Sequence, residues 1–146
     1  EEWALAGSKV WLEQITLSRR QRMAVNINLD SIAGSPNLTA LTSGFAKLGP
    51  FLTDAARKAG HGLRTHRPLM RNSDHANFAD RQIPAARLIA GFNEPDSALR
   101  LLLTGADRRE VVPMQQLREA TVTAGALVWE AMTASPDAMM RIRGAV

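Results

Sequence analysis

The sequence predicts an α/β fold, in which helices flank a layered sheet. Extended and helical runs alternate along the chain, and the clearest strands are residues 23–30 and 83–91. A long amphipathic stretch follows Pro113. Apolar residues make up 45% of the chain and charged residues 22%, a balance typical of a folded domain rather than a disordered segment. The alternation of extended and helical runs is typical of layered α/β domains.

Helices are predicted where apolar residues recur at helical spacing and a stop signal follows. Residues 5–15 show this spacing, and residues 43–59 show it with a break near Gly49-Pro50 and a stop at Gly60 and Gly62. The final long helix carries a continuous stripe of apolar or small residues, namely Met114, Leu117, Thr121, Ala124, Val128 and Ala131.

Strands are predicted where apolar and polar residues alternate between turn residues. In residues 23–30 the apolar Val25, Ile27 and Leu29 alternate with asparagines, and a loop over residues 31–37 follows. The remaining extended segments are expected at residues 63–70, 83–91 and 100–104. A short helix, DHANFADR, follows Ser73, and both Ser73 and Asp74 are expected to accept hydrogen bonds from N–H groups of its first turn.

Charge and cysteine content exclude several classes of site. The net charge is +4, and residues 55–73 hold no acidic side chain but several basic ones: Arg57, Lys58, His61, Arg64, His66, Arg67 and Arg71. This stretch also lacks an aromatic residue to stack on a base, which favours solvated or acid-paired charge over a nucleic-acid surface. The chain has no cysteine, which excludes disulfides, thiolate metal sites and a cysteine nucleophile. No apolar run approaches the ~18 residues that span a bilayer.

Polar residues cluster at three places that a layered sheet can bring together. Glu1 and Glu2 precede a helix, Asp30 ends a strand, and residues 73–75 lie between an extended segment and a short helix. Ligands of α/β sheets gather at the carboxyl ends of the strands, so we expect the three clusters to share one edge. Each cluster also has a structural interpretation: acidic residues favour a helix N-terminus, aspartate is common in turns, and a histidine is often half-buried.

In order along the chain, EEWALAGSKVW, NINLDSIAG, SDHANFADRQIPAARL and LLTGADRREVV resemble the co-catalytic zinc aminopeptidase family. That family includes bacterial leucyl-type aminopeptidases and glutamate carboxypeptidases. The resemblance runs from residue 1 to the final helix. It implies that residues 1–146 are the C-terminal portion of one zinc-peptidase catalytic domain, whose N-terminal portion is the missing partner.

The resemblance also implies roles for individual residues. Glu1 corresponds to the general base, Glu2 to a ligand of one zinc ion, and Asp30 to a ligand of the other. Two zinc ions about 3.5–4 Å apart activate water and polarise the peptide carbonyl. The remaining residues, Ser73, Asp74 and His75, correspond to a segment that shapes the site, with Ser73 and Asp74 in the substrate pocket.

The chain departs from the family pattern at three points. The family's upstream His-x-Asp element and bridging Asp do not occur in it, and it has no tyrosine. The family's last ligand is a His before Thr, but here Leu103 precedes Thr104. We therefore expect either one tight zinc and a weaker second, or a rearranged site in which His75 serves as the missing ligand.

Three hypotheses about function follow. The first is a secreted or periplasmic zinc exopeptidase acting on peptides, with an aminopeptidase as the leading form. The second is a non-catalytic binding or dimerisation module of the same superfamily, favoured by Leu103. The third is a polyanion-binding domain that rests on charge alone and would show a steep salt dependence.

Overall fold

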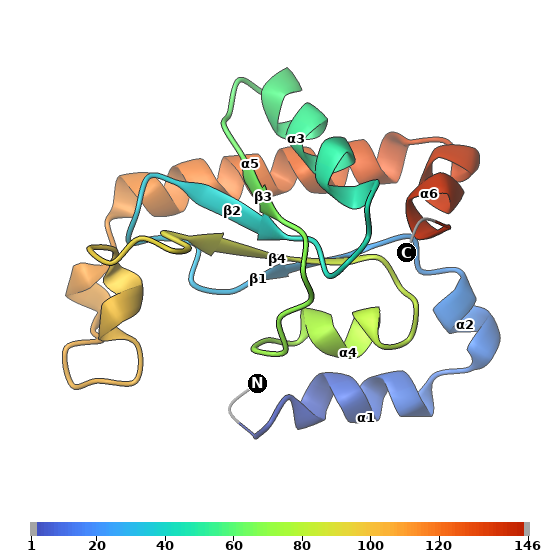
Figure 1. Ribbon diagram of the computed structural model, residues 1–146, viewed down its shortest axis with the longest axis horizontal. Coiled ribbons are helices and arrows are strands. Elements are labelled where there is room, and N and C mark those ends of the chain that lie inside the picture. Colours follow the sequence, from blue (N-terminus) through green and yellow to red (C-terminus); the bar gives the residue numbers. More distant parts are fainter. Residues whose placement is uncertain (1–2, 145–146) are drawn as a thin grey trace.

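The computed structural model describes residues 3–144, so Glu1 and Glu2 lie outside the described part of the chain. Four strands form one mixed sheet in the order β1-β4-β2-β3 (Figure 1). β1 pairs with β4 in parallel, β4 with β2 antiparallel, and β2 with β3 in parallel. Their bounds are Asn26–Leu29 (β1), Leu38–Leu41 (β2), Arg64–His66 (β3) and Ala85–Ala90 (β4). The predicted α/β class is confirmed.

Helices cover both faces of the sheet. On one side of the sheet, α5 (Met114–Thr133) contacts α3 (Leu48–Lys58) (Figure 1). On the other side, α4 (His75–Ala79) packs on β4 and β1, and α1 (Ala6–Gln14) packs on α4. The remaining helices are α2 (Leu17–Gln21) and α6 (Pro136–Arg143), with two short 3₁₀ turns, η1 (Ala98–Leu101) and η2 (Arg109–Val111). Arg143 Nη1 donates to the carbonyl of Gln21 at 2.8 Å, which joins α6 to α2.

The core lies between the two central strands and their covering helices. All residues of β2 and β4 are buried, as expected for strands covered on both faces. β4 carries alanine at three of its six positions, namely Ala85, Ala86 and Ala90. From α5, Ala120, Ala124 and Leu127 enter the core. The alanines of this set have small side chains, which allow the backbones of the sheet and the helix to approach each other closely.

The structure corrects several predicted boundaries. Residues 43–47 are not helical, since α3 begins at Leu48, and residues 38–41 form a strand that was not predicted. A fully buried strand has no alternation, so LTAL carries no period-2 signal. Residues 100–104 do not form a strand: they belong to η1 and the turns after it. The helices α2 and α6 were also missed, because each is short.

Four basic side chains of residues 55–73 form ion pairs with acidic side chains. Arg57 bonds Asp54 at 2.5 Å, and Arg71 bonds Asp80 at 2.5 Å. Lys58 reaches Glu130 at 2.5 Å, and Arg64 reaches Glu94 at 2.7 Å. This supports the interpretation as acid-paired surface charge. Within residues 3–144, no helix is both long enough and apolar enough to cross a membrane.

Candidate active site

Asp30 and Ser73 meet at the carboxyl ends of β1 and β4. The backbone N–H of Asp30 donates to the Leu88 carbonyl at 3.2 Å, which continues the pairing of β1 with β4. The Ser73 hydroxyl donates to Asp30 Oδ2 at 2.5 Å and accepts from Asn28 Nδ2 at 2.7 Å. Ser73 is only 1% exposed. Two predicted site segments therefore lie side by side, joined by a buried hydroxyl.

Arg87 is a site residue that the sequence reasoning missed. It lies on β4 opposite Asn28 in the strand register, and its Nη2 is 3.1 Å from Asp30 Oδ2. The Arg87 side chain is 6% exposed and that of Asp30 24%. The available signal was an arginine inside the otherwise apolar run IPAARLIAG, because a charged residue in a buried strand needs a partner.

Asp74 connects α4 to the beginning of α1. Its carboxylate accepts a hydrogen bond from the Ser8 hydroxyl. Asn77 Nδ2 donates to Ser8 Oγ at 2.7 Å and to the Leu5 carbonyl at 2.9 Å. These bonds fix the position from which the chain leads back toward residue 1. They also come from partners that sequence patterns did not identify.

The predicted side-chain cap of α4 is wrong. Asp74 occupies the N-cap position, but no side-chain cap bond forms there. The Ser73 hydroxyl is taken by Asp30, and the Asp74 carboxylate by Ser8. Long-range partners therefore outcompete the local N–H groups.

His75 lies beneath the site rather than on its surface. It is 0% exposed, and its ring nitrogens make no hydrogen bond of normal geometry with the described residues. Burial, with the positive charge of Arg87 as the next cause, lowers the pKa of His75 to about 4. The ring is therefore neutral at neutral pH. A ligand role for His75 would require the turn to open, and that role stays a prediction.

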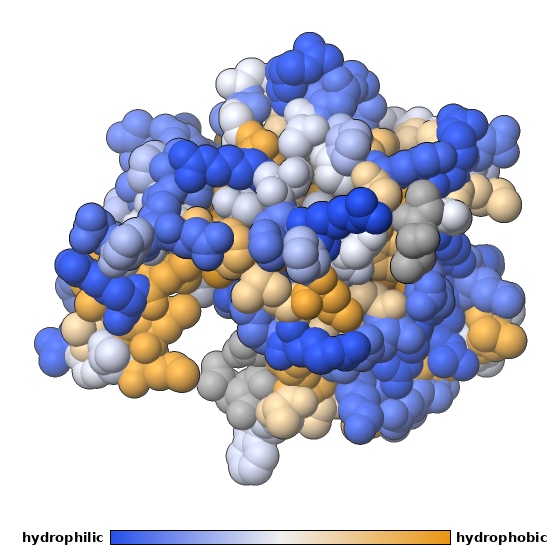
Figure 2. Space-filling view, viewed as in Figure 1, coloured by the Kyte–Doolittle hydropathy of each residue, from blue (hydrophilic) through white to orange (hydrophobic). Residues whose placement is uncertain are grey.

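An open cleft of about 690 Å³ lies above this cluster. Asp30, Arg87 and Asp107 line it, together with Leu103, which is 96% exposed. Figure 2 shows the surface hollowed between the η1–η2 segment and the body of the domain. Ser73, Asp74 and His75 are not among the lining residues, so they support the cleft from below. Leu103 and Asp107, from the stretch compared above with the family's last ligand motif, thus line the same cleft as Asp30.

The residues of this cleft do not by themselves suit two zinc ions. Residues 3–144 contain no group of three or more His, Asp or Glu side chains placed to hold a metal. Asp30 Oδ2 already receives both Ser73 and Arg87, and Leu103 has no lone pair to offer a metal. The fit of Glu1 and Glu2 lies outside the described residues.

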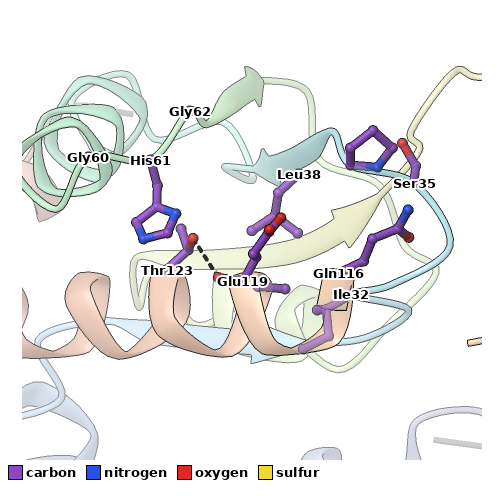
Figure 3. A pocket seen from close by; sticks show the side chains of 11 residues that line it. Ile32, Ser35, Leu38, Gly60, His61, Gly62, Gln116, Glu119 and Thr123 are labelled. Carbon is purple, nitrogen blue, oxygen red and sulfur yellow. Dashed lines mark hydrogen bonds between the residues drawn. The ribbon is translucent and has the colours of Figure 1, made fainter. Parts of the chain in front are cut away.

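A smaller cavity of about 170 Å³ lies elsewhere, between α5, the start of β2 and the turn after α3 (Figure 3). Figure 3 shows His61, Gln116 and Glu119 around it, with Thr123 Oγ1 donating to the Glu119 carbonyl at 2.9 Å. None of the predicted site residues lines this cavity. It is also much smaller than the cleft beside Asp30, which remains the candidate site.

The cleft lies beside the carboxyl ends of sheet strands, where α/β proteins commonly place their ligands, and it is lined by Asp30, Asp107 and several apolar side chains. The chain belongs to the peptidase family M28, because the sequence model of that family matches residues 1–120. The predicted resemblance to co-catalytic zinc aminopeptidases is thereby confirmed. No curated protein matches the sequence.

Solved structures of aminopeptidases share this fold. The zinc aminopeptidase BSAP from Bacillus subtilis is 25% identical, with a TM-score of 0.76 over 90% of this chain and 34% of that protein. The aminopeptidase from Aneurinibacillus sp. strain AM-1 is 24% identical, with a TM-score of 0.71 over 87% of this chain and 30% of that one. The LapA aminopeptidase of Legionella pneumophila is 17% identical, with a TM-score of 0.71 over 90% and 36%. The chain thus spans about a third of the length of these structures.

Proposed function

We propose that the complete protein is a zinc-dependent exopeptidase, with an aminopeptidase as the leading form, and that this chain supplies one wall of its peptide-binding cleft. The observation that carries the proposal is the meeting of Asp30 and the Leu103–Asp107 segment in one cleft. Membership in the peptidase family M28 supports the reaction class.

The described residues have three tasks in this proposal. Ser73 orients the Asp30 carboxylate through its hydrogen bond, and the Asn28 amide holds the Ser73 hydroxyl in place. The contacts of Asp74 and Asn77 with Ser8 hold the start of α1 beside the cleft. The cleft also has apolar lining residues that suit an uncharged substrate side chain. They are Ile89, Phe92, Leu99 and Leu102.

The roles of Glu1 and Glu2 rest on the sequence resemblance. Glu1 is proposed as the general base, because a carboxylate beside bound water can take its proton and pass it to the leaving amine. Glu2 is proposed as a metal ligand. We expect residues 1–146 alone to bind zinc weakly and to hydrolyse no peptide, because they span only about a third of the length of the matching aminopeptidases.

The test uses the complete protein and aminoacyl p-nitroanilides. We expect release of N-terminal residues that a chelator abolishes, and zinc content that survives Glu1→Gln while turnover falls by about 10²–10⁴-fold. Glu13→Gln, in the exposed part of α1, is the control and should leave turnover unchanged. Robust activity that resists chelators would contradict the proposal.

A second candidate is a non-catalytic peptide-binding or dimerisation module. This candidate is favoured by Leu103, which lines the cleft and is nearly fully exposed. The family pattern has a histidine at this position. In that case the complete protein should retain peptides without cleaving them. Mass spectrometry of peptides after incubation distinguishes the two candidates, since only the first shortens them.

A further inference from the structure

We propose that the guanidinium of Arg87 takes the place of a metal cation at Asp30, so that Asp30 does not hold zinc in this protein. The inference rests on the proposed function in one respect: it assumes that Asp30 lies at the metal edge of the cleft. It differs from that proposal in what it assigns to the Asp30 carboxylate.

Arg87 is fixed against Asp30 by the strand that carries it. β4 is buried along its whole length, and Arg87 pairs in register with Asn28, which lies two residues before Asp30. Its Nη2 is 3.1 Å from Asp30 Oδ2, and its Nη1 donates to the Asn72 carbonyl at 3.3 Å. The Arg87 side chain is only 6% exposed, so its charge is largely shielded from water and needs a protein partner.

Arg87 depends on Asp30 for its counter-charge. Among residues 3–144, Asp30 is the only carboxylate within ion-pair distance of Arg87. Removing one partner of a buried ion pair leaves an uncompensated charge, which is strongly destabilising. A zinc ion that took over the Asp30 carboxylate would leave Arg87 in this state.

The Asp30 carboxylate has little capacity left for a metal. Oδ2 receives Ser73 at 2.5 Å as well as Arg87, and Oδ1 receives the Ser31 hydroxyl at 3.2 Å. A dication bound to either oxygen would lie close to the guanidinium. Like charges in a partly buried site repel more strongly than in water, because the local dielectric constant is lower. The site therefore favours the guanidinium over zinc.

Leu103, another lining residue of the cleft, also argues against zinc binding. It stands where the family pattern places the imidazole of the other zinc ion, and a leucine cannot bind metal. The two described positions expected to supply metal ligands are thus a carboxylate already paired with Arg87 and an aliphatic side chain. This agrees with the non-catalytic candidate and does not depend on it.

The first experiment is zinc titration of the complete protein and its Asp30→Asn variant, with calorimetry and with Co²⁺ absorption as a second readout. We expect equal zinc content in both proteins and a lower urea midpoint for the variant, because Arg87 loses its counter-charge. Loss of one zinc equivalent on Asp30→Asn would overturn the inference, since it would show that Asp30 is a ligand in the natural protein.

The second experiment removes the cation. Arg87→Met should tighten zinc binding by at least about tenfold, or add one equivalent, and Asp30→Asn in the same protein should cancel the gain. Arg71→Met is the matched control, because it removes the same charge from the same cleft at a residue that pairs with Asp80 instead. Unchanged zinc binding in Arg87→Met, or an equal gain in Arg71→Met, would overturn the inference. If Arg87→Met does not fold, the Asp30→Asn comparison decides.

These measurements separate the inference from the proposed function. Zinc content and Co²⁺ spectra need no turnover, so a protein without peptidase activity can still show the effect of Arg87. Conversely, a chelator-sensitive peptidase that loses zinc on Asp30→Asn would support the proposed function and overturn only the inference.

Discussion

The amide of Asn28 donates to the hydroxyl of Ser73 across 2.7 Å, and this bond ties β1 to the segment that precedes α4. Ser73 in turn donates to Asp30, so a single buried hydroxyl links a strand, a turn and the candidate acidic residue. Ser73 is a positioning residue, since it acts on the cleft through Asp30.

Ser73→Ala in the complete protein should lower the free energy of unfolding by about 1–3 kcal/mol. The substitution leaves the Asn28 amide without its buried acceptor and Asp30 without a donor. Ser18→Ala, on the exposed α2, is the control and should change stability by less than about 0.5 kcal/mol. Urea denaturation measures both, and equal effects would contradict the structural role of Ser73.

Gly91→Ala should destabilise the protein, whereas Gly125→Ala should stabilise it. Gly91 has φ +72°, and a Cβ there would lie 2.3 Å from the Ser97 Cβ, so the substitution brings both backbone strain and a clash. We expect a loss of about 1–3 kcal/mol or more. Gly125 lies in α5 with open space around it, and alanine should gain about 0.5–1 kcal/mol there. The melting temperature should therefore shift in opposite directions in the two variants, and a shift in the same direction would contradict the close contact between Gly91 and Ser97.

Stability should fall between pH 6.5 and pH 4 because of His75. The pKa of His75 is lowered from 6.5 to about 4, first by burial and then by Arg87. Between these values the unfolded chain binds a proton at His75 that the folded chain does not. The contribution of His75 to the free energy of unfolding is therefore complete above pH 6.5 and disappears as the pH falls to 4. That contribution is roughly 3 kcal/mol, from 1.36 kcal/mol per pKa unit.

His75→Gln removes this titration, and its unfolding free energy should depend less steeply on pH in that window. His61→Gln, which changes a partly exposed histidine, serves as the control and should keep the natural slope. Urea unfolding at several pH values tests the prediction, which fails if the His75→Gln and natural proteins have the same slope.

Leu103→His should tighten one zinc ion of the complete protein by at least about tenfold, because it supplies an imidazole at a cleft position that now has none. His75→Ala should change zinc binding little if the buried ring is not a ligand. If His75 has replaced the missing ligand, its removal should release one zinc instead. Competitive metal titration distinguishes these outcomes, and two tight zinc ions unaffected by either change would show that the missing ligand lies elsewhere.

The sequence alone determined the parts of the protein that local patterns encode. The alternation in residues 23–30, the apolar run at 83–91 and the stripe after Pro113 each predicted an element that the structure contains. Asp30 at the end of its strand and the order of four short segments predicted the family. Such signals are readable because periodicity and turn chemistry involve neighbours along the chain.

Only the tertiary structure decided which side chains meet. β2 has no alternation because both its faces are covered, and Arg87, Asn28 and Ser8 find their partners across the sheet or between helices. The same packing removed Ser73 and Asp74 from the predicted cap, since a buried long-range partner satisfied each side chain instead. Contacts of this kind depend on how strands and helices are stacked, and residue spacing along a single segment carries no information about that arrangement.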